Sequence, residues 1–238
     1  MQLEHKQRIS KLEQIFNIKV SDEKLYLKAL THSSYTKENS ISSLENYERL
    51  EFLGDAVLKI CISEILYKEF PEYAEGDLTK IRSIAVSDAT LADVAIELGL
   101  DKLIILGKQE EKTGGRKRKS IIACTFEAVL GACYLEKKSD ELFSFLESNF
   151  KKIIKNLDEN IDKFNAKAVL QEYTQSQNKK TPDYQIVNEI GPQHDKLFVV
   201  EVSYMGSPLS QGQGKTKREA EQDAAYKACV KLGVIAGE

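Results

Sequence analysis

The sequence predicts two domains of different fold class, an all-α domain over residues 1–155 and an α+β domain with the order α-β-β-β-α over residues 165–238. Apolar residues recur at three- and four-residue spacing through most of the first domain, which is the periodicity of a helix. The segment KLFVVEVSYMG at 196–206 instead alternates apolar and polar residues, as a strand does. The short polar segment NLDENIDKF at 156–164 separates the two periodicities, and we expect it to form a flexible linker.

The first domain contains helical patterns and no stretch that alternates long enough to indicate a strand. The clearest helical stretches are SEILYKEF (63–70), DATLADVAIELGL (88–100) and DELFSFLESNFKKIIKNL (140–157). Gly99 and Gly107 are predicted to mark helix ends or turns. The domain is therefore expected to be built from helices joined by short turns.

The second domain is predicted to contain a helix, three strands and a second helix. These elements are expected at 166–179, at 181–191, at 196–206 with Phe198, Val200, Val202 and Tyr204 on one face, around Leu209, and from Thr216 to about Leu232. A domain of about this size can bury its own core and fold independently.

The charge balance is slightly acidic, with 34 Lys and Arg against 37 Asp and Glu among 238 residues, a net charge of −3. Residues 165–238 carry 9 basic and 9 acidic residues, so the whole deficit belongs to residues 1–164. Such a balance disfavours a generally basic surface that binds nucleic acid through net charge alone.

Targeting and cysteine patterns favour a cytoplasmic protein. The N-terminus is charged from the start, and the longest apolar stretch, AVLGACYL at 128–135, is far shorter than the roughly 18 residues needed to span a bilayer. The cysteines, which form no CxxC pair, are Cys61, Cys124, Cys133 and Cys229. We therefore expect no membrane association, no structural zinc site and a reducing compartment.

The segment NYERLEFLGDAVLKICI at 46–62 combines acidic residues with an otherwise apolar helix. At about 100° per residue, Glu48, Glu51 and Asp55 form one narrow stripe. Apolar residues occupy most of the remaining circumference, namely Leu50, Phe52, Leu53, Ala56, Val57 and Leu58. The helix is therefore expected to be buried nearly all round, where carboxylates are costly unless they are paired or hold a metal ion.

A second apolar helix, SIIACTFEAVLGACYL at 120–135, carries the single charged residue Glu127. If the two helices pack together, Glu51, Asp55 and Glu127 can converge on a hard divalent cation such as Mg²⁺ or Mn²⁺. The alternative is simple ion pairing of the acids, with Arg49, Lys59 or Arg82 as partners. Three acids in register with a fourth on another helix favour the metal site, which suits metal-assisted hydrolysis.

These motifs resemble those of bacterial ribonuclease III, an endonuclease that cuts double-stranded RNA. The resemblance rests on NYERLEFLGDAVL and extends through ALTHSSY (29–35), AEGDLTKIRS (74–83) and TGGRKRKSIIACTFEAVLGA (113–132). It ends in a double-stranded-RNA-binding domain over about 165–233, and so covers nearly the whole chain.

The resemblance implies a role for each acid. It implies that Glu51, Asp55 and Glu127 bind Mg²⁺, with Mn²⁺ as a substitute, and that Asp55 and Glu127 are essential for catalysis. Glu48 would contact RNA or support the ligands, and Phe52 would plug a pocket on the partner subunit of a homodimer. The expected products carry 5′-phosphate and 3′-hydroxyl ends with staggered 3′ overhangs.

Cys124 departs from the family pattern, in which an Asp stands three residues before the catalytic Glu. A thiol is a soft ligand that is normally protonated near neutral pH, and it replaces a carboxylate poorly at Mg²⁺. We therefore hypothesise weak metal binding at this corner of the site and slow or absent cleavage.

The segment GQGKTKREAEQDAAYKA contains a capping box, Thr216 with Glu219, so a helix is expected to begin at Lys217. Ala220, Ala224 and Ala228 would let this helix lie close to the sheet. The cations that crowd its N-terminus are Lys215, Lys217 and Arg218, and they would favour a bound phosphate there, although a solvated basic helix end is equally compatible with the pattern.

The family resemblance assigns these three cations to phosphates across the major groove of a duplex. It also places Gln171, Glu172 and His194 against successive minor grooves, where shape and 2′-hydroxyls are read. The RKRK segment at 116–119 is expected to be a mobile basic loop, and His32 to be structural.

We conclude from the sequence that the chain is a metal-dependent, homodimeric ribonuclease III that processes ribosomal RNA precursors, some messages and transfer RNA. The first alternative is a duplex-RNA-binding protein whose nuclease centre is impaired by Cys124. The second is an unrelated helical protein with buried ion pairs. Metal-dependent cleavage of duplex RNA distinguishes the three.

Overall fold

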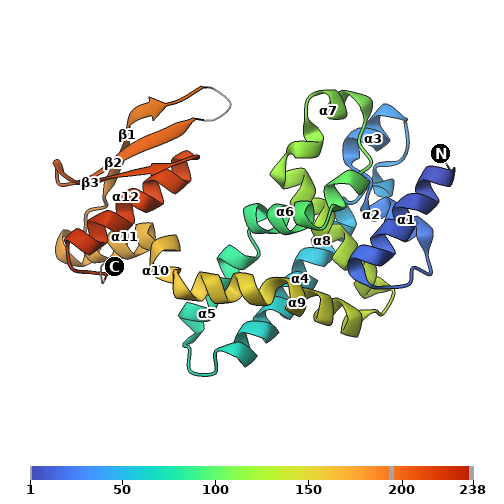
Figure 1. Cartoon of the computed structure of the whole chain (residues 1–238), viewed down its shortest axis with the longest axis horizontal. Coiled ribbons are helices and arrows are strands. Elements are labelled where there is room, and N and C mark those ends of the chain that lie inside the picture. The colour runs from blue at the N-terminus through green and yellow to red at the C-terminus, as the bar shows by residue number, and fades with distance from the viewer. Residues whose placement is uncertain (1, 193–195, 236–238) are drawn as a thin grey trace. The chain divides into compact units, whose positions relative to one another are not determined.

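The computed structural model of the chain describes residues 2–192 and 196–235. It divides into two compact units, residues 1–156 (unit 1) and 157–238 (unit 2). Unit 1 is helical and unit 2 combines helices with a sheet, which confirms the predicted fold class (Figure 1). None of the helices in these described ranges has the length and apolar character needed to cross a bilayer.

Unit 1 is an assembly of helices around one long central pair. Its α-helices are α1 (Gln2–Phe16), α2 (Glu23–Ala29), α3 (Ser33–Glu38), α4 (Glu48–Glu69), α5 (Glu75–Ala85), α6 (Asp88–Glu97), α7 (Lys108–Lys112), α8 (Lys119–Leu135) and most of α9 (Ser139–Glu159). Its short 3₁₀ turns are η1 (Ser43–Glu45), η2 (Leu100–Leu103) and η3 (Gly115–Lys117). As predicted, Gly99 follows α6 in the left-handed conformation, and Gly107 precedes α7.

Helices α4 and α8 form the central pair because two glycines let their backbones approach. A Cβ atom on Gly54 would lie 1.7 Å from the carbonyl oxygen of Glu127, and one on Gly131 would lie 2.3 Å from that of Leu50. No side chain larger than hydrogen fits at either position. The crossing of α4 and α8 is therefore fixed at Gly54 and Gly131, next to the predicted acidic residues.

The core of unit 1 surrounds this crossing. Helix α8 is buried along most of its length, and Phe126 at its centre packs among aromatic rings from α1 and α9. The ring centroids of Phe126 lie 6.2–6.3 Å from those of Phe16, Phe145 and Phe150. Packing of this kind holds α8 rigidly, so that the residues on its α4-facing side have fixed positions.

One face of α4 is exposed, which corrects the expectation that this helix is buried nearly all round. Leu50, Val57 and Leu58 are buried, but Phe52 is 82% and Ile60 is 68% exposed. Phe52 and Ile60, two turns apart on α4, thus belong to an exposed apolar surface and not to the core. The sequence pattern could not separate the two because a core and an interface are equally apolar.

Unit 2 contains a three-stranded antiparallel sheet and helices that cover one face of it (Figure 1). Its elements are α10 (Ile161–Phe164), α11 (Ala166–Asn178), β1 (Asp183–Ile190), β2 (Leu197–Tyr204), β3 (Ser207–Gly214) and α12 (Lys217–Lys231). The strand order is β1-β2-β3, with Val200 opposite both Ile186 and Gly212. The predicted helix, three strands and helix are therefore confirmed.

Helix α12 lies close to the sheet, as its small residues predict. Ala220, Ala224 and Ala228 are fully buried against β2 and β3. A Cβ atom on Gly212 would lie 2.0 Å from the backbone nitrogen of Ala224, so β3 also needs glycine at this contact. The short distance between helix and strand fixes the position of the N-terminus of α12.

The segment 156–164 is helical, although we expected a flexible linker. Helix α9 continues to Glu159, and α10 spans Ile161–Phe164. Leu157, inside the expected linker, is 4% exposed, and its burial gives the end of α9 an apolar anchor. A polar composition did not exclude a helix here because Asp, Glu and Lys are compatible with an exposed helical face.

Candidate nuclease site and RNA-binding surface

The predicted site acids lie on both sides of the α4–α8 crossing. Glu51 and Asp55 flank Gly54 on α4, and the carbonyl group of Glu127 on α8 faces Gly54 directly. Both Glu51 and Glu127 are partly buried, and 38% of the Asp55 side chain is exposed. Glu48 is exposed at the start of α4, so it does not belong to the buried stripe that the sequence indicated.

Glu127 is the most strongly perturbed of these carboxyl groups. Burial, followed by the charges of Asp55, Glu51 and Asp88, raises the pKa of Glu127 to about 8. A carboxyl group near like charges keeps its proton because ionisation would add another negative charge to a poorly hydrated place. The structure thus brings the acids of α4 and α8 into one electrostatically coupled group.

Asp55 already has a cationic partner, the Nζ atom of Lys59, at 2.7 Å one turn along α4. One of the ion pairs considered as an alternative to a metal site is therefore present. Arg82, another partner considered, instead donates to the hydroxyl groups of Ser63 and Thr79 at 2.8 and 3.3 Å. Lys59 therefore neutralises part of the charge of these acids, and Arg82 bonds elsewhere.

Cys124 occupies the corner of the site between Glu51 and Tyr47. The Cys124 thiol interacts with the Glu51 carboxylate, and the Tyr47 hydroxyl interacts with Cys124. Burial, the interaction with Glu51 and the neighbouring carboxylates raise the pKa of the Cys124 thiol, which therefore stays protonated at neutral pH. The protonated thiol adds no negative charge to the site.

The donor chemistry suits a hard divalent cation, since Glu51, Asp55 and Glu127 offer oxygen ligands from two rigid helices. Burial is the main cause of the raised pKa of Glu127, and the negative charges of Asp55 and Glu51 add to it; a bound cation would offset these charges. Across residues 2–192 and 196–235, no set of three or more acidic, His or Cys side chains is already arranged to hold a metal. A cation bound here would compete with Lys59 for the Asp55 carboxylate.

Asp88 was missed by the sequence analysis. It is the first residue of α6, and its charge contributes to the raised pKa values of both Cys124 and Glu127. An acidic residue in the first turn of a helix is common, so the sequence contained no signal that set Asp88 apart. Tyr47, by contrast, stands within the NYERLEFLGDAVL motif.

The basic segment at 116–119 is not the mobile loop that we expected. Arg116 donates to Glu111 and to the backbone carbonyl groups of Asp101 and Ile104, at 2.8 and 3.0 Å for the carbonyls. Arg118 is paired with Glu110, and Lys119 with Asp93. Partners on neighbouring elements therefore fix this segment, and Lys119 already belongs to α8.

His32 has the structural role that we expected. Its Nδ1 atom accepts a hydrogen bond from the backbone N–H of Ser34 at 3.1 Å and caps α3. Its ring packs edge-on against Tyr47, and burial lowers the pKa of the imidazole. A neutral imidazole at this position connects α3 with the start of α4.

In unit 2 the predicted Thr216 cap forms at the start of α12, although the Glu219 side chain bonds to the backbone N–H of Lys215 and not to that of Thr216. The Thr216 side chain accepts a hydrogen bond from the N–H of Glu219 at 3.1 Å, while Glu219 accepts one from the N–H of Lys215 at 2.9 Å. Lys217 and Arg218 are exposed in the first turn, and the Lys217 ammonium lies 5.9 Å from the Phe198 ring centroid. The cap thus fixes the backbone from which these basic side chains extend.

The remaining predicted RNA contacts are exposed or outside the described residues. Gln171 and Glu172 are exposed in the first half of α11, where they are accessible to a ligand. His194 lies outside the described residues. The described candidates in unit 2 are therefore exposed polar residues on α11 and exposed basic residues at the start of α12.

Comparison with known proteins identifies both units. Residues 22–154 match the Ribonuclease-III-like family, and residues 166–232 match the double-stranded RNA binding motif. A protein named Ribonuclease 3 from Halalkalibacterium halodurans is 43% identical over 227 residues, which is 95% of this chain and 86% of the relative. Another Ribonuclease 3, from Natranaerobius thermophilus, is 45% identical over 212 residues, 89% of this chain and 91% of that protein.

A solved structure supports the same assignment for unit 1. The nuclease domain of ribonuclease III from Campylobacter jejuni superposes with a TM-score of 0.55 and 38% identity, covering 60% of this chain and 96% of that one. The fold and its acidic crossing define an endoribonuclease with an attached double-stranded-RNA-binding module. The chain belongs to the ribonuclease III family.

Proposed function

We propose that this chain hydrolyses phosphodiester bonds of double-stranded RNA with Mg²⁺, for which Mn²⁺ can substitute. The observation that carries the proposal is the coupled set of Glu51, Asp55 and Glu127 at a helix crossing fixed by glycines. A bound divalent ion supplies an activated nucleophile near neutral pH and offsets charge on the phosphate. The products would carry 5′-phosphate and 3′-hydroxyl ends and staggered 3′ overhangs.

In this proposal each residue of the site has a separate task. Glu51, Asp55 and Glu127 hold the cation, and Asp55 and Glu127 are essential for catalysis. Lys59 neutralises the charge of Asp55 until the cation binds. Cys124, beside Glu51, would remain a neutral thiol and add no charge to the site. Glu48, exposed one turn before Glu51, would contact RNA or support the ligands.

Unit 2 would hold the duplex by its backbone shape. Lys215, Lys217 and Arg218 at the start of α12 would contact phosphates across the major groove, in reach of a helix N-terminus that favours anions. Gln171, Glu172 and His194 would face successive minor grooves. Contacts of this kind select A-form RNA with little dependence on sequence, as a general processing enzyme requires.

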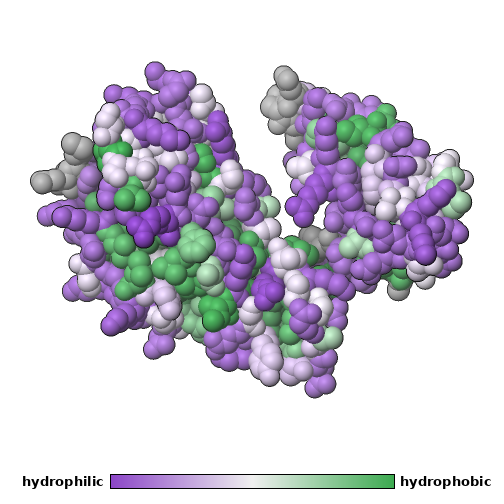
Figure 2. All heavy atoms as spheres, turned by 180° about the vertical axis from the view of Figure 1, so that it is seen from behind, coloured by the Kyte–Doolittle hydropathy of each residue, from purple (hydrophilic) through white to green (hydrophobic). Residues whose placement is uncertain are grey.

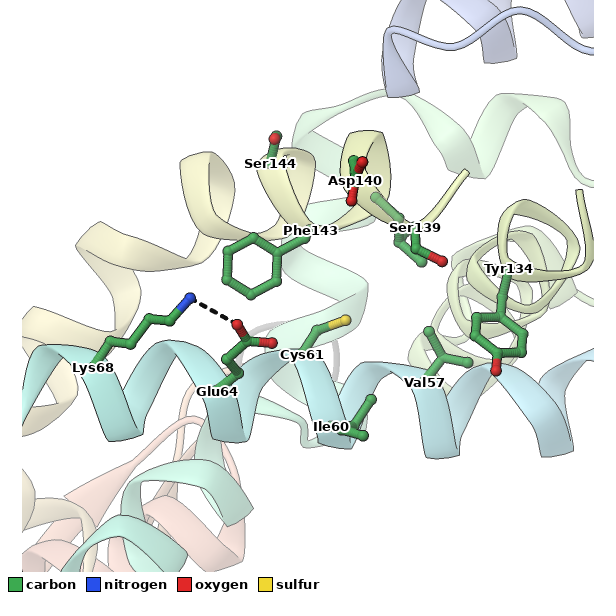
Figure 3. Close-up of a pocket in the computed structure, with 11 residues that line it drawn as sticks. Val57, Ile60, Cys61, Glu64, Lys68, Tyr134, Ser139, Asp140, Phe143 and Ser144 are labelled. Carbon is green, nitrogen blue, oxygen red and sulfur yellow. Dashed lines mark hydrogen bonds and ion pairs between the residues drawn. The ribbon is translucent and has the colours of Figure 1, made fainter. Parts of the chain in front are cut away.

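We further propose a homodimer formed through the exposed face of α4. Phe52 is a protruding aromatic on α4. A recess of about 420 Å³ lies farther along the same helix (Figure 3). The apolar and aromatic residues that line the recess are Val57, Ile60, Cys61, Tyr134, Leu142 and Phe143. Hydrophobic side chains also gather on the surface of unit 1 in the space-filling view (Figure 2). A chain with both a knob and a recess can pair with a second copy through a two-fold interface.

Sedimentation tests the dimer. The chain should sediment at twice its 26.9 kDa mass, and Phe52→Ala should weaken dimerisation by about thirtyfold, as expected for a central aromatic anchor. The matched control is Ile96→Ala, which removes a 45% exposed apolar side chain from α6. Equal dimer affinities for the two variants would contradict the proposed interface.

We place this activity in the cytoplasm, where duplex regions of ribosomal RNA precursors, some messages and transfer RNA precursors are available as substrates. All four cysteines are free in the structure, including the buried Cys133 and Cys229, which suits a reducing compartment.

The test of the nuclease is a cleavage time course on long duplex RNA with Mg²⁺, with Mn²⁺ and with chelator. We expect cleavage with either metal and none with chelator, while duplex binding persists throughout. Glu127→Gln should abolish cleavage and leave RNA binding unchanged. Cys124→Asp should cleave at least about tenfold faster, because it restores a hard ligand; equal rates would contradict the role that we give to the thiol.

The second candidate function is a duplex-RNA-binding protein with an impaired nuclease. The observation that favours it is Cys124, a neutral thiol where the family pattern has a carboxylate. Binding of duplex RNA by the unaltered chain without cleavage in either metal, with cleavage by Cys124→Asp, would select this function.

A further inference from the structure

Lys59 forms an ion pair with one of the three acids to which we assign the divalent cation. Its Nζ atom lies 2.7 Å from the Oδ2 atom of Asp55, one turn away on α4. Within residues 2–192 and 196–235, neither Glu51 nor Glu127 has a lysine or arginine as an ion-pair partner. The chain therefore supplies a cation of its own to a single carboxylate of the proposed site.

This ion pair is open to solvent, so its partners can separate. The Lys59 side chain is 52% exposed and the Asp55 side chain 38%. Because lysine carries its charge on a flexible four-carbon stem, the ammonium group can leave Asp55 without movement of α4, whose backbone is held at Gly54. Exposed ion pairs are weak, and a divalent cation with ligands on two helices can therefore displace the lysine.

Lys59 and a metal ion compete for the Asp55 carboxylate. A Mg²⁺ ion binds a carboxylate oxygen at about 2.1 Å, and a second cation on the same oxygen would be strongly repelled. At the other oxygen of the carboxylate, the metal would still lie within a few ångströms of the ammonium group. The ion pair and the bound metal therefore weaken one another by the same factor.

We propose that Lys59 regulates the metal site as an internal competitor: its ammonium group holds Asp55 until a divalent cation displaces it, and so raises the concentration of cation at which the site fills. This inference rests on the proposed nuclease function. It concerns the metal concentration that the chain requires, and it adds no ligand to the site.

The ordinary alternative is that the pair of Lys59 and Asp55 only stabilises α4. Opposite charges four residues apart do so in many helices. Lys68 and Glu64 form such a pair farther along the same helix, also at 2.7 Å (Figure 3). What sets the first pair apart is that its acid belongs to the proposed metal site, so the two roles must be separated by metal binding.

The test compares Lys59→Gln with a matched control, Lys151→Gln, each in the full chain. Lys151 pairs with Glu69 at the end of α4 at 3.2 Å, and the two side chains are 56% and 42% exposed. The control therefore removes the same charge from a similarly exposed partner of an α4 carboxylate. Mn²⁺ binding is followed without RNA by the electron paramagnetic resonance signal of free Mn²⁺, and the metal-free melting temperature is measured alongside.

We expect Lys59→Gln to bind Mn²⁺ about three- to fivefold more tightly than the unaltered chain, which is the upper range for loss of an exposed ion pair. Lys59→Arg keeps the competing charge and should stay within about twofold of the unaltered chain. Lys151→Gln should also change the affinity by less than about twofold. A lysine that only stabilises α4 would lower the metal-free melting temperature and leave the affinity for Mn²⁺ unchanged.

Two different failures are distinguishable. If the proteins bind Mn²⁺ but Lys59→Gln matches Lys151→Gln, or binds more weakly than the unaltered chain, the role of Lys59 is overturned and the nuclease site stands. If none of the proteins binds Mn²⁺, the proposed metal site fails, and the role of Lys59 fails with it.

Discussion

In both units a glycine lets two backbone segments pack in direct contact, but the side chains beside the contact are acidic in unit 1 and basic in unit 2. In unit 1, Gly54 and Gly131 let two helices touch, and the acids beside the contact are partly buried. In unit 2, Gly212 lets α12 touch β3, but Lys217 and Arg218 at the helix end are exposed. Close backbone contact positions the functional side chains in both units, and only unit 1 also removes them from water.

This difference sets what each site depends on. The acids of unit 1 are coupled because packing holds them together in a poorly hydrated place, so that a change in the crossing changes their chemistry. The cations of unit 2 would act on phosphates through solvent-accessible charge, and this interaction depends on the number of charges and on ionic strength more than on burial. Substitutions in the two units should therefore fail in different ways.

The largest expected effect follows from adding one methyl group at the crossing. Gly54→Ala places a Cβ atom 1.7 Å from the Glu127 carbonyl oxygen, where backbone and not a flexible side chain must move. We expect a loss of more than about 3 kcal/mol in the free energy of unfolding of unit 1, and loss of cleavage. Urea unfolding and the duplex cleavage assay measure the two effects.

The matched control is Gly76→Ala in α5, where nothing lies within 4 Å of the added atom. It should leave unit 1 unchanged or stabilise it by up to about 1 kcal/mol. Duplex binding by unit 2 should survive in both variants. A folded, active Gly54→Ala protein would show that the crossing does not constrain the site.

A smaller effect is expected from one charge in unit 2. Lys217→Ala should weaken duplex-RNA binding by about 1.5 kcal/mol and reduce the slope of log affinity against log salt by about one, without unfolding unit 2. Binding isotherms across a salt series measure both quantities. Lys227→Ala, which removes a lysine paired with Asp223 farther along α12, is the control and should change neither.

The smallest effect concerns the protonation of Glu127 in metal-free protein. The folded-state pKa of Glu127 is raised to about 8. Protonated Glu127 therefore contributes to the free energy of unfolding fully below the unfolded-state pKa, and this contribution is lost as pH rises through 8. Glu127→Gln cannot ionise, so it should melt above the unaltered chain at pH 9, while the difference narrows toward pH 5.

The expected size of this difference is roughly 1 kcal/mol, or about 2–4 °C, because residual solvent contact screens the repulsion. Thermal melts in chelator at pH 5, 7 and 9 would measure it. Glu147→Gln, which removes an exposed carboxylate from α9, provides the comparison and should show no such trend. A pH-independent difference would contradict the coupling of the acids.

Unit 2 was largely predictable from the sequence because its signals are local. The alternation of β2, the Thr216–Glu219 cap and the buried Ala220, Ala224 and Ala228 each depend on residues close in the chain. What could not be predicted was the helical conformation of 156–164, since a polar segment is compatible with either a helix or a linker.

In unit 1 the acids of α4 were recognisable, but their surroundings were not. The exposure of Phe52 and Ile60 could not be predicted because apolar residues serve a core or an interface equally well. The proximity of Asp88 depends on how α6 packs on α8, and such tertiary register leaves no periodic signal. The anchoring of Arg116 by Glu111 and by two carbonyl groups is likewise a tertiary property.

The contact at Gly54 and Gly131 also determines when the acidic site can assemble in a newly synthesised chain. Synthesis proceeds from the N-terminus, so α4 leaves the ribosome well before α8. Until residues 119–135 have emerged, Glu51 and Asp55 have no Glu127 opposite them. A growing chain therefore carries two of the three acids, and on the proposed function it could not cleave nearby RNA until the first unit is nearly complete.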